Sequence, residues 1–228
     1  MNEATSYSLT DDIATITMDD GKVNALSPEL LADLANAFER AQADEAAVVL
    51  TGRPRTFSAG FDLRCGPERW PEMVEAGARL AERMLTFPRP VVVACPGNAI
   101  AMGALLLLSA DHRVGGAGEF RIGLNEVAIG LTLPWFAIAL ARHRLTRPAF
   151  DLCTVSGALL EPRAAQDAGF LDGVVAVDEL MDAAYARARA LNALNPSAHA
   201  ATKLRVRKAV IAGVRDGIER IADPNSEP

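Results

Sequence analysis

The chain has 228 residues, of which 50% are hydrophobic, and its formal net charge is -6 at pH 7. This length and hydrophobic content allow one large domain or two small ones with a substantial core. The acidic balance argues against a nucleic-acid surface, which needs a clustered basic face. The one basic cluster, Lys203, Arg205, Arg207 and Lys208, lies in a segment of helical character. We expect a solvated helix face there, with a local anion site as the alternative.

Cysteine usage and hydropathy bear on the compartment. Cys65, Cys95 and Cys153 are widely spaced and form no C-x-x-C pair, which is typical of free thiols in a reducing cytoplasm. The first ten residues are polar and lack the apolar core of a signal peptide. The uncharged stretch 91–110 could span a bilayer, but Pro, Gly and Asn at 96–98 interrupt it. A buried strand followed by a buried helix explains it better, so we expect no membrane span.

The N-terminal half alternates strand and helix patterns. The β-prone segments 7–10 and 13–18 flank Asp11-Asp12 and predict a hairpin. Ser27 can cap a helix whose first residue is Pro28, where a missing N–H costs nothing. The further elements that we predict in this half are strand 47–50, helix 71–85, strand 91–94, a turn at 96–98, buried helix 101–109, and strands 112–114 and 119–122.

The C-terminal half is mostly helical. We predict helices 134–143, 148–154 and 162–168, a strand at 174–177, and helix from 179 onward with an interruption at 195–196. Because strand and helix alternate through the middle of the chain, we expect an α/β class with a mainly parallel sheet. The C-terminal helices could form a lobe that packs on a neighbouring copy rather than on their own sheet. Residues 223–228 are expected to be a frayed tail.

Two segments, 48–63 and 91–108, share one arrangement of an apolar strand, a turn with small residues, and a helix start. Small residues let a ligand approach the backbone, and a helix N-terminus presents unpaired N–H groups. Two such ends that face one point would bind a carbonyl oxygen and stabilise it as an oxyanion. Tight strand-to-helix turns are also common in α/β folds, so a purely structural role is the alternative.

A third feature is Glu126, which stands among apolar neighbours in the segment 123–127, Gly-Leu-Asn-Glu-Val. A carboxyl group in apolar surroundings has a raised pKa, which suits a group that takes up and returns a proton. The alternative is a surface acid at the edge of a strand and a loop. The three histidines are isolated, so we expect no metal site. No G-x-S-x-G is present, which argues against a serine peptidase.

Four parts of the chain carry motifs of one known family. Residues 22–27, Lys-Val-Asn-Ala-Leu-Ser, match an N-A-L segment, and residues 57–63, Phe-Ser-Ala-Gly-Phe-Asp-Leu, match the loop A-F-x-A-G-x-D-L. Residues 90–113 follow the pattern P-V-I-A-A-V-x-G-x-A-x-G-G-G-x-E-L-x-L-x-x-D-x-R, and 156–175 contain later S-G and G-L-V-D-x-V elements. In this order the motifs resemble the crotonase (enoyl-CoA hydratase/isomerase) superfamily over nearly the whole chain.

The resemblance implies a fold, a substrate and a set of site residues. The fold would be a crotonase-like spiral of ββα units over residues 1–190, with a helical segment 191–228 that assembles a homotrimer or homohexamer. The substrate would be an acyl-CoA thioester, so that coenzyme A is part of the substrate and no separate cofactor is needed. The backbone N–H groups of Phe61 and Met102 would hold the oxyanion, and Glu126 would carry the proton. The substrate-binding residues carried over in the same way are Lys22, Ala25, Leu26, Ala59, Gly60, Leu63, Gly103, Leu105 and Trp135.

Departures from the family pattern bear on the reaction. Its glycine triplet is Ala-Met-Gly at 101–103 here, which crowds the pocket floor. Leu105 stands where hydratases carry their first catalytic glutamate, whereas Glu126 keeps the second. Pro-Trp-Phe at 134–136 stands where many family members have a glycine-rich stretch and would narrow or reshape the acyl pocket. The single glutamate resembles the Δ3-Δ2-enoyl-CoA isomerases most. A hydratase is the second choice. Single-glutamate relatives also include hydrolases and decarboxylases. The alternative from another functional class is a catalytically silent CoA-binding subunit.

Overall fold

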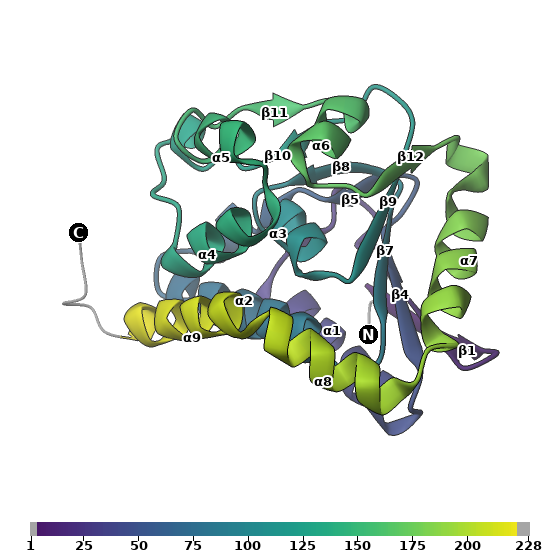
Figure 1. The fold of residues 1–228 in the computed structure, drawn as a ribbon. Helices are drawn as coiled ribbons and strands as arrows, with labels where there is room; N and C mark the ends of the chain where they lie inside the picture. The colour runs from purple at the N-terminus through teal and green to yellow at the C-terminus, as the bar shows by residue number, and fades with distance from the viewer. Residues whose placement is uncertain (1–3, 223–228) are drawn as a thin grey trace.

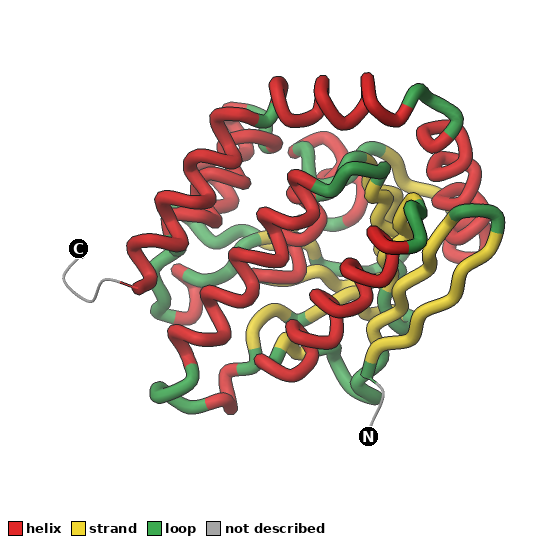
Figure 2. The backbone as a smooth tube through the Cα atoms, turned by 90° about the horizontal axis from the view of Figure 1, so that it is seen from below, coloured by secondary structure: helices red, strands yellow, loops and turns green. Residues whose placement is uncertain are grey.

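The computed structural model describes residues 4–222, in which helices surround two main β-sheets (Figures 1 and 2). The larger sheet has six strands in the order β1, β2, β4, β7, β9 and β12. Its neighbouring strands run parallel, except that β1 and β2 form an antiparallel hairpin. These strands are β1 (Thr5–Thr10), β2 (Ile13–Met18), β4 (Ala47–Thr51), β7 (Val91–Cys95), β9 (His112–Gly116) and β12 (Gly173–Val175).

The second sheet has four strands in the order β11, β10, β8 and β5, and a third pairs β3 with β6. Their bounds are β3 (Ala25–Leu26), β5 (Arg55–Ser58), β6 (Gly60–Phe61), β8 (Gly97–Ile100), β10 (Ile122–Gly123) and β11 (Leu159–Leu160). The chain repeatedly runs from the larger sheet to the smaller one and then into a helix, as in β4-β5-α2 and β7-β8-α3. The predicted α/β class with a spiral of ββα units is therefore confirmed.

The helices cover both faces of the larger sheet. On one face α7 packs Leu180, Ala184 and Ala188 against Val49 and Val92, while α1, α2 and α3 lie on the other side (Figure 1). The helices are α1 (Pro28–Ala43), α2 (Trp70–Thr86), α3 (Met102–Ser109), α4 (Trp135–Arg144), α5 (Arg147–Thr154), α6 (Pro162–Ala168), α7 (Leu180–Asn192), α8 (Pro196–Val206) and α9 (Lys208–Ala222), with 3-10 turns η1 (Leu63–Cys65), η2 (Val127–Ile129) and η3 (Val177–Glu179).

Several local signals act as the sequence predicts. Asp11 and Asp12 adopt φ of 50° and 57° and close the hairpin between β1 and β2, since such a tight turn needs positive φ. The side chain of Ser27 accepts a hydrogen bond from the Leu30 N–H at 3.2 Å, which caps α1. The segment 91–110 is the buried strand β7 and the buried helix α3 that we expected. No helix in the part of the chain that the structure describes is long and apolar enough to cross a membrane.

Three sequence predictions in the smaller elements are wrong. The segment 96–98 is not only a turn, because the strand β8 begins at Gly97. A Cβ atom on Gly97 would lie 1.9 Å from the carbonyl carbon of Arg55, so β8 approaches β5 too closely for a side chain. The predicted strand 119–122 is reduced to β10, and Val177 begins the 3-10 turn η3 instead of ending a strand.

The last helix packs on helices of its own chain, and packing of the C-terminal helices on a neighbouring copy stays a prediction. The buried side chains of Val210, Ile211, Val214 and Ile218 on α9 belong to the main hydrophobic core. In Figure 1, α9 runs beside α2, and α9 contacts both α2 and α4. The assembly role of residues 191–228 stays a prediction, and the expected tail 223–228 lies outside the described residues.

The basic cluster is also placed differently from the solvated helix face that we expected. Arg205 and Lys208 are exposed, but Lys203 and Arg207 are buried and contact Asp111. The helical pattern of the sequence does not show that Lys203 and Arg207 are buried. Both cations lie on the face of the C-terminal helices that packs against the rest of the fold. The Lys203 ammonium lies 2.7 Å from a carboxylate oxygen of Asp111, and the Arg207 guanidinium lies 2.9 Å from the other.

Candidate active site

A cavity of about 370 Å³ lies where the start of α2, the start of α3 and the loop between β10 and α4 meet. Three of its lining residues are polar, namely Asn125, Glu126 and Thr132. Such a largely apolar cavity with a few polar groups is typical of a site for an organic ligand. The remaining lining residues are Ala59, Phe61, Leu63, Trp70, Val74, Ala101, Leu105, Ile129, Leu131, Pro134 and Phe136.

Glu126 is the one carboxylic acid among the described residues that line this cavity. Only 8% of the residue is exposed, and its Oε2 atom is buried without a hydrogen-bond partner. Burial raises the pKa of the carboxyl group to about 7, because the charged form loses its hydration. Near neutral pH the carboxyl group is therefore present in both protonation states, which suits it to accept and return a proton.

Asn125 is a polar lining residue that the sequence analysis did not select. Its Oδ1 atom is buried without a hydrogen-bond partner, as is the Oε2 atom of the adjacent Glu126. Two neighbouring unpartnered oxygens in one cavity indicate a place for a bound polar group or water, since buried polar atoms are rarely left unpaired. The available signal was a second polar residue within the apolar segment 123–127.

Two backbone segments meet beside the cavity. A Cβ atom on Gly60 would lie 2.8 Å from the Cβ of Ala101 and 3.3 Å from the backbone nitrogen of Met102, so only glycine allows this approach. Met102 is the first residue of α3, and first-turn N–H groups have no partner within their helix. Gly60 is followed by Phe61, which lines the cavity, and Met102 follows Ala101, which also lines it. The backbone stretches that carry both predicted donor groups are thus adjacent.

Ala101 holds a strained conformation at this meeting point. Its φ of 51° and ψ of -122° lie in a region that side chains with a Cβ rarely adopt. Backbone strain of this kind costs about 1–3 kcal/mol and is concentrated at functional sites. The same residue precedes α3, and its carbonyl oxygen accepts the first intrahelical hydrogen bond, from Leu105 N–H at 3.0 Å. Ala101 in this conformation therefore joins β8 directly to the start of α3.

The other predicted site residues fall into two groups. Ala59, Leu63 and Leu105 line the cavity, whereas Lys22, Ala25, Leu26, Gly60, Met102 and Gly103 do not. Ala25 and Leu26 pair in parallel with Gly60 and Phe61, so they position the Phe61 backbone. Gly103 has a packing role, since a Cβ atom there would lie 2.6 Å from the carbonyl oxygen of Ser58. The exposed Lys22 precedes this paired segment.

The segment 134–136, which we expected to narrow or reshape the pocket, lines the cavity through two of its three residues. Trp135 is 48% exposed and does not line the cavity, and the Arg220 guanidinium lies 4.9 Å from the centre of its ring. Its two neighbours, Pro134 and Phe136, line the cavity instead. Consecutive residues in the first turn of a helix point in different directions, and α4 turns Phe136 inward.

Several lining residues come from segments that the motifs do not cover. Trp70 and Val74 belong to α2. The Trp70 and Phe61 rings pack edge to face, with their centroids 6.0 Å apart. Ile129 and Leu131 come from the turn after Glu126. The apolar stripe of α2 could be read from the sequence, but which of its residues face a ligand depends on contacts with distant segments.

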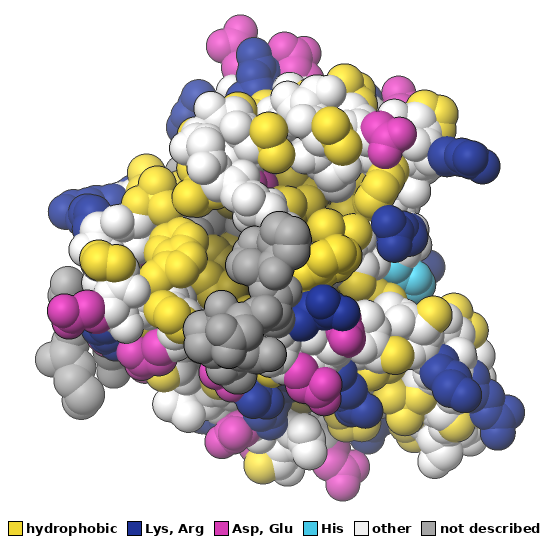
Figure 3. Space-filling model, turned by 90° about the vertical axis from the view of Figure 1, so that its left-hand side faces the viewer, with side chains coloured by type: hydrophobic (Ala, Val, Ile, Leu, Met, Phe, Trp, Pro, Cys, Tyr) yellow, Lys and Arg dark blue, Asp and Glu magenta, His cyan; other side chains and the backbone are white. Residues whose placement is uncertain are grey.

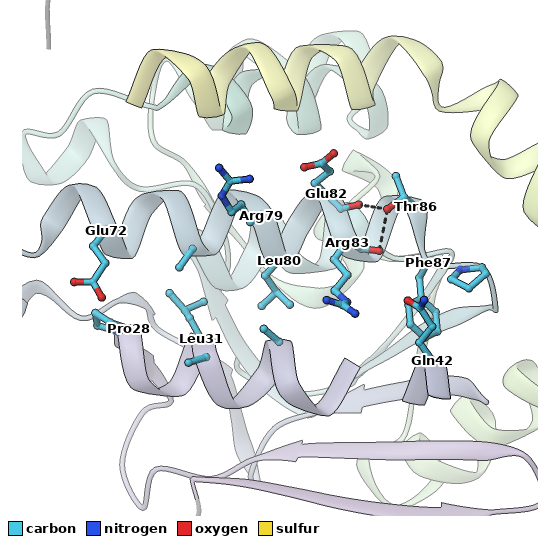
Figure 4. A pocket seen from close by; sticks show the side chains of 14 residues that line it. Pro28, Leu31, Gln42, Glu72, Arg79, Leu80, Glu82, Arg83, Thr86 and Phe87 are labelled. Atoms are coloured by element: carbon cyan, nitrogen blue, oxygen red, sulfur yellow. Dashed lines mark hydrogen bonds between the residues drawn. The ribbon is translucent and has the colours of Figure 1, made fainter. Parts of the chain in front are cut away.

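A second cavity, of about 600 Å³, lies between α1 and α2, as Figure 4 shows. Leu31 of α1 and Leu80 of α2 face it from opposite sides (Figure 4). Each of its two carboxylates has a cationic partner, Glu72 with Arg69 and Glu82 with Arg215. It is larger than the Glu126 cavity, but it offers no buried acid of shifted pKa, and we assign no chemistry to it. Among residues 4–222, no group of three or more His, Cys, Asp and Glu side chains could hold a metal ion.

A ββα spiral whose apolar cavity holds one carboxyl group of raised pKa defines the chain as a protein of the crotonase superfamily. The family model described as enoyl-CoA hydratase/isomerase matches residues 9–219. The chain belongs to this family and is one of its enzymes.

Relatives of both activities are similar to the chain. A Thermus thermophilus protein with a provisional name as an enoyl-CoA hydratase is 33% identical over 89% of this chain and 83% of its own length. The human mitochondrial enoyl-CoA delta isomerase 1 is 29% identical over 86% of this chain and 68% of its own. A solved apo structure from Mycobacterium tuberculosis, named as an enoyl-CoA isomerase, is 44% identical, covers 97% of this chain and 99% of its own, and superposes with a TM-score of 0.94. Another solved structure of the same mycobacterial protein is named as an enoyl-CoA hydratase, is 44% identical, covers 96% of this chain and 94% of its own, and superposes with a TM-score of 0.93.

Proposed function

We propose that the chain is an enoyl-CoA isomerase that moves a double bond from C3 to C2 of an acyl-CoA thioester. The observation that carries this proposal is that one acid stands among the described residues that line the cavity. Glu126 lines the cavity with a raised pKa, and Leu105, which occupies the position of the first hydratase glutamate, lines it as an apolar residue. A single carboxyl group can move a proton between two carbons, whereas hydration benefits from a second acid that fixes and activates water.

The proposed proton transfer has two steps. The Glu126 carboxylate removes a proton from C2 of the 3-enoyl thioester, and the electron pair spreads over C2, C4 and the thioester oxygen. The protonated Glu126 then returns the proton to C4, which leaves the double bond between C2 and C3, in conjugation with the thioester. A pKa of about 7 serves both steps, because neither protonation state of Glu126 is strongly favoured near neutral pH.

The negative charge on the thioester oxygen needs hydrogen-bond donors during both steps. We assign this role to the backbone N–H groups of Phe61 and Met102. The adjacency of their backbone segments supports the assignment, as does the position of Met102 at the start of α3. Removing one such donor typically lowers the rate about 10²–10³-fold. The acyl chain would lie along the apolar wall that includes Trp70, Val74 and Phe136.

A hydratase is the second candidate, and Asn125 is the observation that favours it. The unpartnered Oδ1 atom of Asn125 could accept a hydrogen bond from a water molecule beside Glu126. That water could then add to C3 of a 2-enoyl thioester while Glu126 acts as the acid or base. An amide cannot itself take a proton from water at neutral pH, so we expect hydration to be slower than isomerisation.

Product analysis separates the two reactions. We would supply 3-enoyl-CoA and 2-enoyl-CoA thioesters of short to medium chain length and follow the conjugated 2-enoyl product and the 3-hydroxyacyl product separately. Rapid formation of the conjugated product with little 3-hydroxyacyl-CoA is expected. A 3-hydroxyacyl product formed at a comparable rate would replace the isomerase proposal with the hydratase. Binding of thioesters without any product would favour a silent CoA-binding subunit.

We also propose that the chain assembles as a homotrimer or homohexamer. Hydrophobic side chains gather on the face over α4, α5 and the end of α9 (Figure 3). The exposed apolar residues of α4 and α5 include Trp135 and Leu152, and Val155 follows α5. Contiguous apolar surface of this kind marks contact sites between proteins. Light scattering tests the proposal, and a monomer at micromolar concentration would contradict it.

A further inference from the structure

A third cavity, of about 580 Å³, lies at the opposite end of α4 from the Glu126 cavity. The first turn of α4 contributes Phe136 to the Glu126 cavity, whereas its last turn contributes His143 and Arg144 to this one. Phe136 and His143 are seven positions apart on this ten-residue helix, which is about 10 Å along its axis. The remaining walls come from α8 and from the ends of α3 and α7, so this cavity is distinct from the candidate active site.

The lining carries more positive than negative charge. Arg144, Lys203 and Arg207 are cationic, and Asp111 is the one carboxylate among the described residues of the lining. Asp111 already serves two partners, since its oxygens lie 2.7 Å from the Lys203 ammonium and 2.9 Å from the Arg207 guanidinium. Two positive charges are therefore left without a compensating carboxylate in the lining.

A purely structural role for these cations explains part of the arrangement. Arg207 donates to the carbonyl oxygens of Leu85 and Ala110, each at 3.1 Å, and Arg144 also donates to Ala110. These carbonyl groups lie at the C-terminal ends of α2 and α3, where each helix dipole contributes about half a negative charge. The two helix ends together offset about one positive charge, so a surplus remains.

Two polar atoms in the lining have no partner. The Nε atom of Arg144 and the Nε2 atom of His199 are buried and make no hydrogen bond in the structure. A guanidinium with a free Nε–H can bind an oxyanion through a fork of two N–H groups. Thr202 and Asn195 add further polar groups to the same lining. The lining thus combines surplus charge with two polar nitrogens that no protein atom satisfies.

Burial makes the surplus charge unfavourable. Burial lowers the pKa of Lys203 to about 8, with Arg207 acting in the same direction, and it lowers that of Arg144 to about 10, with Arg113 and Arg207 adding to the effect. The basic side chains in this setting are less easily protonated, because they are desolvated and lie close together. A bound anion would relieve both effects, whereas an apolar or cationic ligand would not.

The mouth of the cavity determines which anion suits it. Leu191, Leu194 and Val206 line the cavity, and Leu194 and Val206 are 52% and 71% exposed. We propose that this cavity is a binding site for an organic carboxylate with an apolar body, held by Arg144 at its carboxylate and by the three aliphatic residues at its chain. Its volume lies in the range of small-molecule sites and exceeds what an inorganic ion needs.

Calorimetric titration of the intact protein with hexanoate tests the site. The controls are inorganic phosphate, 1-hexanol and sodium chloride at matched ionic strength. Saturable binding of hexanoate, tighter than that of phosphate and absent for 1-hexanol, is expected. Arg144→Met should weaken hexanoate binding at least tenfold, because the charge and the donor fork are both lost. Arg144→Lys keeps the charge and should bind between the two.

A second variant keeps the test decisive if Arg144→Met folds poorly. Val206→Ser removes an exposed apolar rim residue without adding charge and should weaken hexanoate more than phosphate, since only hexanoate uses the apolar rim. Hexanoate that binds no better than chloride would overturn the proposal. Hexanoate binding that is unchanged in both variants but lost in Leu105→Trp would also overturn the proposal. It would assign the ligand to the Glu126 cavity instead. If Arg144→Met loses assembly while anion binding is unchanged, the proposal is overturned. Arg144 would then hold a carboxylate of a second copy.

Discussion

Glu126 has two features that oppose stability and favour reactivity. Its carboxyl group is buried, and one of its oxygens has no hydrogen-bond partner. A buried polar atom left unpaired costs free energy of folding, and the charged form costs more. Selection for folding alone would replace it with an apolar residue or pair it. Its presence among apolar neighbours is therefore best explained by a chemical role, in line with the general conflict between stability and activity.

This cost predicts a pH-dependent effect of Glu126→Gln on stability. The folded-state pKa of about 7 lies above the ordinary value of 4.5, so the unfolded chain releases this proton first as the pH rises. Wild type therefore loses stability between these two values, and above them the loss is on the order of 3 kcal/mol. The variant cannot ionise there and avoids this loss. Thermal unfolding should show the variant clearly more stable than wild type near pH 8 and much closer to it near pH 4.

The matched control is Glu82→Gln, because the half-buried Glu82 pairs with the exposed Arg215. Its effect on stability should stay within about 1 kcal/mol at both pH values. A Glu126→Gln variant that is less stable than wild type near pH 8 would contradict the raised pKa of Glu126.

The turn between β8 and α3 is the element that brings the two backbone segments together. Ala101 holds a positive φ there, and Gly60 leaves space for it. In most proteins a glycine would occupy a position such as 101, since it adopts this conformation without a steric penalty. An alanine in its place adds a methyl group to the cavity lining and stores strain directly before the first N–H of α3.

Relief of this strain predicts that Ala101→Gly stabilises the fold by about 1 kcal/mol, after the entropy of the added glycine is included. Urea unfolding measures the change. The control is Ala104→Gly within α3, where the same replacement should cost about 1 kcal/mol or more. Equal destabilisation in both variants would show that Ala101 is not strained.

The strands and helices differ in how far the sequence predicts them. Long elements with clear signals were predicted well, as for α1 with its Ser27 cap and for the hairpin at Asp11-Asp12. The strand β8 was not, because its Gly-Asn-Ala-Ile sequence has little strand propensity and pairs only through its neighbours β5 and β10. Local preference cannot reveal an element that long-range pairing stabilises.

The candidate site shows the same division. Glu126, Phe61 and Leu105 could be selected from the sequence because family motifs mark them, and all three line one cavity. Trp70 and Val74 could not, because only the packing of α2 against the rest of the fold shows which of its faces meets the cavity. Within the segment 134–136, the sequence does not show that Pro134 and Phe136 line the cavity and Trp135 does not, since a one-residue difference in a helix changes the direction of a side chain.

Across the fold as a whole, Asp111 links segments that lie far apart in the sequence. One of its carboxylate oxygens accepts from Val91 N–H at the start of β7 and from Lys203 of α8, and the other contacts Arg207. The central sheet and the C-terminal helices are thereby joined at one buried carboxylate. Its pairs differ from the exposed ion pairs of this protein, which solvent screens.

Asp111→Asn should therefore destabilise the protein strongly. The amide leaves the buried Lys203 and Arg207 without their charged partner, and breaking a buried pair typically costs about 3–5 kcal/mol. Urea unfolding gives the value, and the exposed Arg215 pair serves as the reference through the Glu82→Gln variant. A cost below about 1 kcal/mol would show that α8 is held by apolar packing alone.

The most direct test of the central claim is the pH dependence of kcat/KM for a 3-enoyl-CoA thioester, with Glu126→Gln beside wild type. For wild type we predict one ascending limb with an apparent pKa near the value of about 7 that burial gives Glu126. We predict that Glu126→Gln lowers the rate by at least about 10²-fold above pH 7, with a smaller difference at acidic pH where wild-type Glu126 is itself protonated, while thioester binding is retained. Turnover of the variant within a few-fold of wild type, or an unchanged pH profile, would contradict Glu126 as the proton carrier.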